Sequence, residues 1–521
     1  MRRFTILFIT LSSGFLAQSQ VPNWSENIAP ILYARCTNCH NVNGIAPFEL
    51  MSYSDAVSYG SDIRSDVNSG IMPPWPPDAA YSHLAHERIL TVQEKADIIS
   101  WVDNGMPEGN PNLAPTPPVY TGIAQLTSPD LVSQIAPYTV NTTTDLYRCF
   151  VIPTNLATAK YITEIEAIPG NRNIVHHILI YEDSTSTPAN LDAQDPGPGY
   201  TNFGGTGSLY SKLIGVWVPG SGLSTYPGGM GIKLPAHTNI ILQIHYPGPT
   251  LNQIDSTQVR FKLSSGPLRE ISIAPVLNHY QLDNGPLVIP GNTTKTFTAH
   301  YTLTCDVSAL AVGPHMHLIG HSISSWAISP ASDTIPFISI PNWDFHWQGM
   351  YSFPRVLHLT TGTTIYSTAF YDNTSNNPDN PNNPPQLVTL GEATTDEMML
   401  IYFAYTYYFP GDESIIQDSN LVLTSTPVIN NDLVHSLQLY DPFPNPSAKG
   451  FEVSCFLPNA SILNATLTNA QGKSVWNYNT GKSIVSGFTS IRVPALPGIK
   501  GAFFLVVDDG TTRRTKKILI E

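Results

Sequence analysis

The chain has 521 residues, which is too long for a single hydrophobic core and suggests three or four domains. Charged residues make up only 12% of it, whereas 45 prolines and 36 glycines indicate turn-rich β structure, and the 42% of hydrophobic residues can fill several cores. Because 25 Lys and Arg stand against 39 Asp and Glu, with no basic stripe before the extreme C-terminus, the composition argues against a nucleic-acid partner.

Residues 1–19 have the layout of a secretory signal peptide. Two arginines precede an apolar stretch, and small residues follow near Ala17 and Ser19. The apolar stretch is too short and too often interrupted for a membrane helix, and no other segment approaches about 18 unbroken apolar residues. We therefore expect an exported protein, either secreted or held at the outer-membrane surface, with the periplasm as the alternative.

The segment 20–112 contains CTNCH, in which Cys36, Cys39 and His40 have the spacing that attaches a c-type haem. The two thiols would form thioether bonds, and His40 would bind the iron. The alternative is a redox or zinc-binding pair of cysteines, but the sequence has no second C-x-x-C. Met72, in the Pro-rich GIMPPWPP, is the candidate sixth iron ligand, and its alternative role is that of a core methionine.

A helix is predicted over TVQEKADIISWVDNG, residues 91–105, because Thr91 and Glu94 can form a capping box and Gly105 ends the apolar pattern. With CTNCH and MPPW, this segment resembles the small cytochrome c domains at the N-terminus of bacterial multidomain oxidoreductases, which implies a small all-α domain. The Pro-rich sequence that follows predicts a linker, placed at 113–124.

The region that follows, to about residue 430, consists of short apolar segments broken by Gly, Pro and Asn, which predicts two β-sandwiches at 125–265 and 266–430. IVHHILIY places His176 and His177 next to each other. Neighbouring side chains of a regular strand point to opposite faces, so both can reach one ion only where the strand is bulged or twisted. NIILQIHYPGP adds His245, with Gln243 on the same face as a possible partner of a metal ligand.

The second predicted sandwich contains AVGPHMHLIGH, in which His315 and His317 stand two residues apart. In a β-strand such side chains share a face and can converge on one ion, although each could also be an ordinary core histidine. TTDEMMLIYFAY presents Met398 after two carboxylates. Imidazole suits copper or zinc, whereas a thioether favours Cu(I), so this set predicts copper that cycles through its reduced state.

The order HH, QIHY, HMHLIG and DEMM resembles the copper type II, ascorbate-dependent monooxygenases, the family of peptidylglycine alpha-hydroxylating monooxygenase and dopamine beta-monooxygenase. The resemblance spans about residues 125–425 and implies two jelly-roll sandwiches with one copper each. DLYRC, which contains Tyr147, and the Asn/Pro-rich stretch 371–385 also resemble segments of the family. Tyr147 and Gln243 are then expected beside the metal ligands. The implied ligands are His176, His177 and His245 for the electron-relay copper, and His315, His317 and Met398 for the oxygen-activating copper.

The resemblance implies that one atom of O2 is inserted into an aliphatic C–H bond while the other leaves as water. Each copper stores one electron and ascorbate restores both; the upstream haem is expected to supply or supplement these electrons. Catalysis would then rest on His315, His317 and Met398, with Tyr402 matching a substrate-contacting tyrosine. Gly313 and Leu400 depart from the peptide-hydroxylating enzyme, which has an arginine and an asparagine there, so an apolar or phenolic small molecule competes with a peptide as substrate.

Besides the haem pair, only Cys149, Cys305 and Cys455 remain. An oxidising compartment permits a Cys149–Cys305 bridge, so a disulfide bond is among the expectations. The tail, 438–521, alternates apolar strands with turns and predicts a small Ig-like sandwich. Its PFPNP and KKILIE motifs resemble the sorting domain of the type IX secretion system, which implies the secretion machinery as a partner. The alternative is an ordinary accessory β domain.

Two other functions fit part of the pattern. The chain could be a non-enzymatic haem and copper electron-transfer protein of the cell surface. It could instead be a zinc hydrolase that uses His176, His177 and His245. The thioether of Met398 argues against both, because it is a poor ligand for zinc and completes a ligand set at the second copper site, which the electron-transfer alternative takes to be vestigial.

Overall fold

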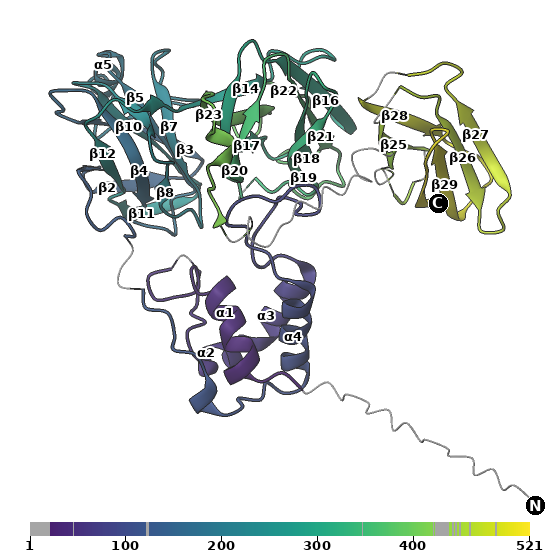
Figure 1. Cartoon of the computed structure of the whole chain (residues 1–521), viewed down its shortest axis with the longest axis horizontal. Helices are drawn as coiled ribbons and strands as arrows, with labels where there is room; N and C mark the ends of the chain where they lie inside the picture. Colours follow the sequence, from purple (N-terminus) through teal and green to yellow (C-terminus); the bar gives the residue numbers. More distant parts are fainter. Residues whose placement is uncertain are drawn as a thin grey trace, which may run out of the picture. The chain divides into compact units, whose positions relative to one another are not determined.

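The computed structural model describes residues 21–419 apart from 45, 121–123 and 346, residue 421, and residues 437–520 apart from 440–441, 443–444, 448–449, 458–459 and 485–486. The predicted signal peptide lies outside these residues. The described chain is mainly β, with a few short helices near its N-terminus, which confirms the predicted fold class at this level (Figure 1). It falls into two compact units, one up to residue 421 and one from residue 437.

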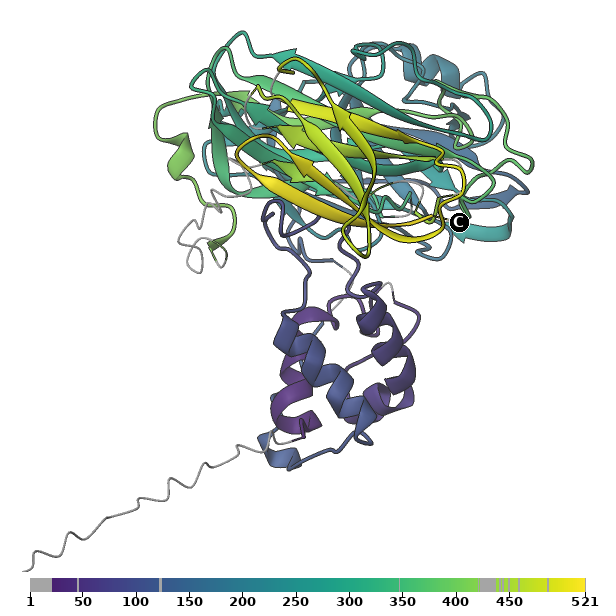
Figure 2. The same cartoon turned by 90° about the vertical axis from the view of Figure 1, so that its right-hand side faces the viewer.

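The N-terminal helices form a cluster of their own (Figure 2). They share a small apolar core built on Trp24, Leu32 and Trp101. The predicted capping box is present in α4, where Glu94 N–H donates to the Thr91 hydroxyl and Thr91 N–H donates to the Glu94 carboxylate. Among the described residues, no helix reaches the length and apolar character that a membrane crossing requires. The elements are η1 (Trp24–Ile28), α1 (Ala29–Arg35), α2 (Tyr53–Ser58), α3 (Gly60–Ser69), α4 (Val92–Asp103) and η2 (Pro111–Leu113).

The first sandwich consists of two sheets that share one apolar core. One sheet has the order β1-β12-β4-β9-β13, with β8 paired to β4, and the other has the order β6-β3-β10-β5-β7. The large sheet contains β1 (Leu131–Gln134), β12 (Gln258–Ser264), β4 (Lys160–Ile168), β9 (Met230–Leu234), β13 (Arg269–Glu270) and β8 (Ser224–Thr225). The other contains β6 (Tyr200–Thr201), β3 (Leu146–Pro153), β10 (Asn239–Tyr246), β5 (His177–Asp183) and β7 (Lys212–Trp217). The pair β2 (Tyr138–Thr142) and β11 (Thr250–Asp255) and the helix α5 (Thr187–Asp192) complete it.

The second sandwich is built in the same way, from two four-stranded sheets around one core. The first sheet contains β14 (Ser272–Asn278), β23 (Leu400–Tyr407), β17 (Val307–His315) and β20 (Tyr351–Leu359). The second contains β16 (Thr293–Thr302), β21 (Thr364–Asn373), β18 (Gly320–Ile328) and β19 (Thr334–Ile340). The pair β15 (Val288–Ile289) and β22 (Val388–Thr389) and the turn η3 (Asp412–Ser414) are attached to it.

The two sandwiches pack directly on each other. Leu310 and Ala404 of the second sandwich belong to the apolar core cluster of the first. Arg269 of β13 also forms a two-pronged ion pair with Asp412, with nitrogen–oxygen distances of 2.6 and 2.7 Å. Apolar burial and a paired guanidinium together favour one fixed arrangement of the two sandwiches.

Part of the predicted haem domain packs on the second sandwich instead of on its own helices. Leu84 is fully buried in the core of that sandwich, and Ala85 N–H donates to the carbonyl of Ser352 at 2.8 Å. Asp78 N–H donates to the carbonyl of Ser339 at 2.8 Å. The segment between α3 and α4 therefore anchors the helical part to the sandwiches.

The tail unit also has two sheets over one core. In β29 alternate side chains are buried, as the sequence pattern predicts for a strand with one face on a core. Its elements are β24 (Gln438–Leu439), β25 (Gly450–Leu457), β28 (Gly487–Pro494), β27 (Ser474–Asn479), β26 (Asn464–Asn469), β29 (Gly501–Asp508) and β30 (Arg513–Ile520).

The expected disulfide bond is wrong. All five cysteines are free thiols. Cys149 lies buried in β3 of the first sandwich, whereas Cys305 packs against the core of the second, so each belongs to a different core. Permissive redox conditions do not bring two thiols together when the fold separates them.

Candidate metal centre

Three adjacent strands of the first sandwich place aromatic side chains in one row. In β10, His245 stands opposite Tyr147 of β3 on one side and opposite His177 of β5 on the other. Residues that are directly opposite in a sheet lie on the same face, so the register brings these rings together. The ring of Tyr147 stacks on that of His245 with centroids 4.3 Å apart and an angle of 5° between the planes.

His176 joins this row because β5 begins only at His177. His176 lies in the turn before the strand, and its N–H donates to the carbonyl of His245 at 2.9 Å. The alternation of a regular strand therefore does not apply between the two neighbours. This resolves the question that the sequence left open, since both histidines reach the same place without a bulge.

The three imidazoles converge through their Nδ1 atoms. Nδ1 of His176 is 3.0 Å from Nδ1 of His177 and 3.2 Å from Nδ1 of His245, and candidate ligand atoms of all three lie within 4.8 Å of one another. Burial and the neighbouring histidines hold the pKa of His177 well below its usual value. Neutral imidazoles keep the lone pair that binds a metal ion, so the cluster fits copper.

Asp145 contacts His245 on the side of the ring that faces away from the other two histidines. Its Oδ1 lies 3.6 Å from Nε2 of His245, and the interaction with His245 helps to lower the pKa of Asp145 to about 2. A carboxylate at the far nitrogen of a ligand histidine fixes the orientation of the ring and raises its basicity. Asp145 therefore helps to keep Nδ1 of His245 turned toward the other two histidines.

His315 and His317 stand at the end of a strand and not within it. β17 ends at His315, and His317 lies in the following turn, so the predicted strand is shorter than the motif. The side chains still lie on one side of the chain, with ring centroids 5.1 Å apart at 84°, while Met316 between them is fully buried in the core. The two imidazoles are thus brought together as expected, by a turn instead of by strand pleating.

The Nδ1 atoms of this second pair are already engaged. Nδ1 of His315 contacts the side-chain oxygen of Gln348, and Nδ1 of His317 lies 3.1 Å from the carbonyl oxygen of Asp396. Burial lowers the pKa of His315 to about 3 and that of His317 to about 4, so both rings are neutral at pH 7. A neutral ring that donates from Nδ1 presents the lone pair of Nε2 to a metal.

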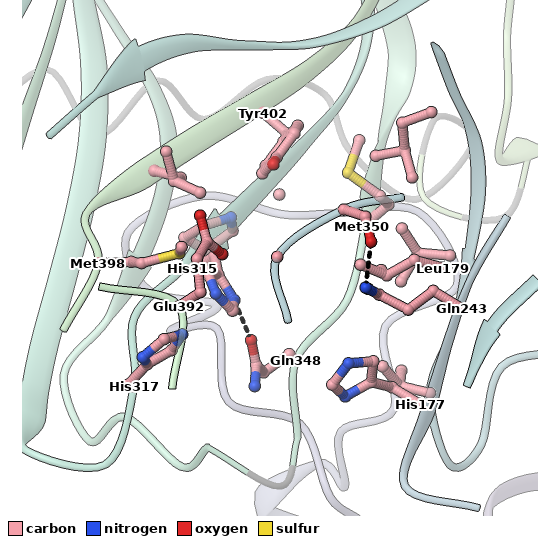
Figure 3. Close-up of a pocket in the computed structure, with 18 of the residues that line it drawn as sticks. His177, Leu179, Gln243, His315, His317, Gln348, Met350, Glu392, Met398 and Tyr402 are labelled. Atoms are coloured by element: carbon pink, nitrogen blue, oxygen red, sulfur yellow. Dashed lines mark hydrogen bonds between the residues drawn. The ribbon is translucent and has the colours of Figure 1, made fainter. Parts of the chain in front are cut away.

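Met398 lies two residues before β23 and is 5% exposed. Figure 3 shows its sulfur beside His315 in the same pocket. Its carbonyl accepts a hydrogen bond from the Tyr371 hydroxyl at 2.7 Å. The fully buried carboxylate of Glu397 accepts backbone N–H groups from His317 and Ile319, both at 2.9 Å. Glu397 therefore ties the histidine turn to the segment that presents Met398.

Members of both ligand sets line one cavity with a volume of about 400 Å³: His176 and His177 of the first set, and His315, His317 and Met398 of the second (Figure 3). Phe345 stands between them: its ring lies 5.4 Å from that of His176 and 5.8 Å from that of His317. Gln243 also lines the cavity, where its amide donates to the carbonyl oxygens of Asn202 and Gly205. A single aromatic ring is thus flanked by a histidine of each set.

The rest of the cavity lining is largely apolar, and no Lys or Arg occurs among the described residues that line it. A side chain at Gly313 would collide with the sulfur of Met350, which occupies the space in front of this position. Tyr402 stands opposite Gly313 in the sheet, and burial raises the pKa of its hydroxyl to about 12. The apolar lining side chains include Leu179, Leu213, Val216, Val218, Met350 and Leu400, and the polar ones include Tyr181, Tyr280, Tyr402, His279 and Glu392.

The C-x-x-C-H motif folds as a tight turn after α1. The N–H groups of Cys39 and His40 both donate to the carbonyl of Cys36, and Nδ1 of His40 lies 3.0 Å from the carbonyl oxygen of Phe48. This leaves Nε2 of His40 as a ligand atom and both thiols free, so the motif fits a covalent haem. Met72 is partly exposed, and its role as an iron ligand stays a prediction.

Four residues of the site were not predicted from the sequence, although each lies in a stretch with a recognisable composition. Asp145 opens the DLYRC stretch, and Glu397 is one of two carboxylates before Met398. Phe345 and Gln348 lie in the aromatic-rich WDFHWQ stretch, more than 25 residues from any ligand in the sequence. The signal that could have identified Phe345 and Gln348 is a run of aromatic residues with one amide side chain inside a β domain.

Comparison with known proteins supports copper chemistry for the first sandwich. Residues 132–253 match the family model "Copper type II ascorbate-dependent monooxygenase, N-terminal domain". DBH-like monooxygenase protein 1 of Gallus gallus is 22% identical over 325 residues, which cover 57% of this chain and 49% of that protein. The human protein of the same name is 22% identical over 294 residues, covering 53% and 46%.

The chain thus spans about half the length of the curated relatives it matches. Among solved structures, a β-glucuronidase of Faecalibacterium prausnitzii covers 44% of this chain and 38% of its own, at 12% identity and a TM-score of 0.13, which is too low to bear on the fold. Residues 132–253 of the first sandwich are thus similar to the N-terminal domain of the copper type II monooxygenases, and the chain is a distant relative of the DBH-like monooxygenases.

Proposed function

We propose that this protein is a copper-dependent monooxygenase that inserts one atom of O2 into an aliphatic C–H bond of a small molecule. The observation that carries the proposal is that two unlike ligand sets reach one cavity. Two of the three clustered histidines line it, together with a set of two histidines and a methionine. The family match of residues 132–253 supports copper at the first set. We further propose that the two sandwiches are the jelly-roll copper domains of such an enzyme.

The two ligand sets would have different roles because their donor atoms differ. Copper, when bound, supplies one-electron transfer and reaction with dioxygen. His176, His177 and His245 would hold the relay ion, and their supports Tyr147 and Asp145 limit rearrangement of the rings. His315, His317 and Met398 would hold the ion that meets dioxygen, because a thioether stabilises Cu(I). Burial of His317 and Met398 limits the access of bulk water to this second set.

The cavity lining supports an apolar or phenolic substrate over a peptide that ends in a carboxylate. Without a Lys or Arg in the described lining, a bound carboxylate would lose its hydration and gain no cation. The sulfur of Met350 occupies the space in front of Gly313, where a cationic side chain would have to stand. Tyr402, which is paired with Gly313 on the adjacent strand, offers one hydroxyl to orient a polar substituent.

We propose electron entry at the contact between the haem motif and the first sandwich. Nη1 of Arg172 donates to the carbonyl of Asn43 at 2.6 Å, three residues after His40, and Arg172 lies four residues before His176. A covalent haem, when bound, supplies a one-electron carrier, in place of ascorbate or beside it. Stopped-flow mixing of the haem-reduced protein with O2 and substrate tests this role: haem oxidation should track turnover, and haem that stays reduced during turnover contradicts it.

Export also remains a proposal. The N-terminal 19 residues would direct export, and the tail at 438–521 would be read by secretion machinery as an Ig-like sorting domain. Mass spectrometry of the protein from the culture medium should find an N-terminus near residue 20 and, where sorting removes the tail, a C-terminus before residue 438. Retention of the intact chain in the cytoplasm contradicts this proposal.

Metal analysis, oxygen consumption and product mass spectrometry on one preparation test the proposed activity. The expected result is copper bound to the chain and a substrate that gains one oxygen atom, with activity lost in Met398→Ile. Copper binding with oxygen uptake unchanged by Met398→Ile would instead favour the non-enzymatic electron-transfer protein. Zinc without copper would favour a hydrolase that uses the three histidines.

A further inference from the structure

One carboxylate links the first ligand set to the chain segment that precedes Met398. Asp145, just before β3 of the first sandwich, has Oδ1 3.6 Å from Nε2 of His245. Its other oxygen, Oδ2, accepts a hydrogen bond from the hydroxyl of Thr394 at 3.0 Å. Thr394 belongs to the second sandwich, 249 residues away in the sequence. One side chain therefore contacts a ligand of the first set and the backbone segment that leads to the second.

Thr394 lies in a turn that determines the position of the second ligand set. In this turn Ala393 N–H donates to the carboxylate of Asp396 at 3.3 Å, and the carbonyl oxygen of Asp396 lies 3.1 Å from Nδ1 of His317. Met398 follows two residues later. A displacement of Thr394 would therefore move both the partner of His317 and the segment that presents the thioether.

Asp145 is itself held in place on the first sandwich. Gly248 N–H donates to its Oδ1 at 3.3 Å, in addition to the contacts with His245 and Thr394. Its side chain is 34% exposed, whereas that of His245 is 3% exposed, so the carboxylate stands where the buried site meets solvent. A carboxylate with a fixed backbone donor can transmit the orientation of one partner to the other.

We propose that Asp145 is a positioning residue for both metal sites, and that the Asp145–Thr394 hydrogen bond couples the three-histidine site to the site formed by His315, His317 and Met398. This inference rests on the proposed function, because it assigns copper to both sets. It goes further in one respect: the second site should respond to changes at Asp145, although Asp145 contacts none of its ligands.

Three variants of the full-length protein test the coupling. Thr394→Val removes the hydroxyl and keeps the shape, Asp145→Asn weakens the contact with His245, and the third variant combines both. Thr395→Val, the neighbouring exposed threonine, is the matched control. The readouts are copper affinity at each site from chelator competition, the Cu(II) EPR spectrum of the three-histidine site, and the stretching frequency of carbon monoxide added to the Cu(I) protein.

We expect Asp145→Asn to alter the EPR spectrum and to weaken copper binding at the three-histidine site by about 10-fold, the lower end of the effect of losing a partner of a ligand. It should also shift the carbon monoxide frequency at the second site. Thr394→Val should leave the EPR spectrum unchanged, but should shift the carbon monoxide frequency and weaken copper binding at the second site. In the Asp145→Asn background Thr394→Val should have little further effect, since the bridge is already weakened.

The coupling is overturned if Thr394→Val behaves like Thr395→Val in all three readouts, or if the two changes act independently in the combined variant. Thermal unfolding of each apo variant shows whether it folds, and Thr394→Val is replaced by Thr394→Ala if it unfolds early, because alanine also lacks the hydroxyl. Thr394→Ser, which keeps the hydroxyl, should keep the wild-type readouts. If the wild type binds copper at both sites and Thr394→Val changes none of the readouts, only the coupling is contradicted. A wild-type chain that binds no copper removes the proposed function as well.

Discussion

The two ligand sets of the cavity are built by different means. His177 and His245 occupy opposed positions on adjacent strands, so backbone hydrogen bonds of the sheet define where they stand. His317 and Met398 lie outside strands, in segments held by the buried carboxylate of Glu397. A sheet register resists local change, whereas turns tied by a few side chains can shift. We therefore expect the first site to tolerate substitution better than the second.

The two ligand sets also differ in which imidazole nitrogen is available to bind a metal. In the first set the Nδ1 atoms face one another, as with His176 and His177 at 3.0 Å. In the second set Nδ1 of His317 is engaged by the carbonyl of Asp396, which leaves Nε2 for a metal. The first set therefore presents a compact cluster of Nδ1 atoms. The second set presents Nε2, the imidazole nitrogen farther from the backbone, beside a soft thioether. This asymmetry suits one ion that only transfers electrons and one that also meets dioxygen.

The largest expected effect comes from removing the thioether. Met398→Ile should abolish oxygen-dependent product formation while copper stays at the three-histidine site, because the soft ligand belongs to the second set alone. Oxygen consumption and copper content measure the two effects. Met399→Leu is the control, since Met399 is 1% exposed in the apolar core and should tolerate a change that conserves volume. Equal loss of activity in both variants would mean that packing, and not sulfur, matters.

Removing a histidine of the row should cost one copper ion per chain. His245→Ala deletes the central ring, on which Tyr147 stacks, and should lower the copper content by about half and remove the Cu(II) signal of that site. The exposed His300 supplies the control variant His300→Ala, which should keep all of the copper. Copper content that is unchanged in His245→Ala would show that the cluster is not a metal site.

Glu397→Gln tests the statement that the second site depends on buried hydrogen bonds. An amide keeps one acceptor oxygen but points an N–H₂ group toward backbone donors, so the apo protein should lose about 1–3 kcal/mol of unfolding free energy. Copper affinity should fall at the second site and hold at the first. Chelator competition measures this, and equal losses at both sites would contradict the separate construction of the two.

The free energy of unfolding of the apo protein should depend on pH in a way that reveals the buried, neutral histidines. Folding lowers the pKa of His315 to about 3 and that of His317 to about 4, so the folded state binds fewer protons than the unfolded state. Their stabilisation is complete above about pH 6.5 and is lost as the pH falls from there toward 4. The buried Glu397, with a pKa raised to about 8, acts in the opposite sense, so the histidine effect is measured as a difference.

Unfolding free energies of wild type and His315→Gln are therefore compared between pH 7 and pH 4. The wild type should lose more stability than the variant, by an amount on the order of 2 kcal/mol. Parallel curves for the two proteins would show that His315 is charged or solvated in the apo state.

The smallest expected effect is at the cavity wall. Tyr402→Phe removes one hydroxyl and keeps the ring, so copper content and stability should hold while KM for a phenolic or hydroxylated substrate rises by a few-fold, the loss of about one hydrogen bond. An apolar substrate should show no change in KM. A large fall in kcat with both substrates would assign Tyr402 a part in the chemistry and not in binding.

The sequence names the candidate ligands more readily than the contacts that hold them. His176, His177 and His245 could be named from their spacing and family order, but whether the first two meet depended on where β5 begins. That boundary is decided by tertiary contacts, here the hydrogen bond from His176 to the carbonyl of His245. The supports Asp145, Gln348 and Glu397 act across sheets or sandwiches, and no local pattern encodes such contacts.

The predicted domain plan shows the same limit. The helix at Thr91 could be predicted, since a capping box and an apolar face are local features that the structure confirms. Leu84, in contrast, belongs by sequence to the haem segment and by packing to the core of the second sandwich. The expected Cys149–Cys305 bridge failed for a related reason, because compartment and composition carry no information about distance in space.

X-ray absorption at the copper edge, on wild type and Met398→Ile loaded with Cu(I), tests the central claim most directly. The claim is that one chain holds two unlike copper ions and that Met398 supplies sulfur to one of them. The account predicts about two copper ions per wild-type chain and a sulfur contribution that disappears in Met398→Ile. A wild-type spectrum that fits nitrogen and oxygen alone would contradict it.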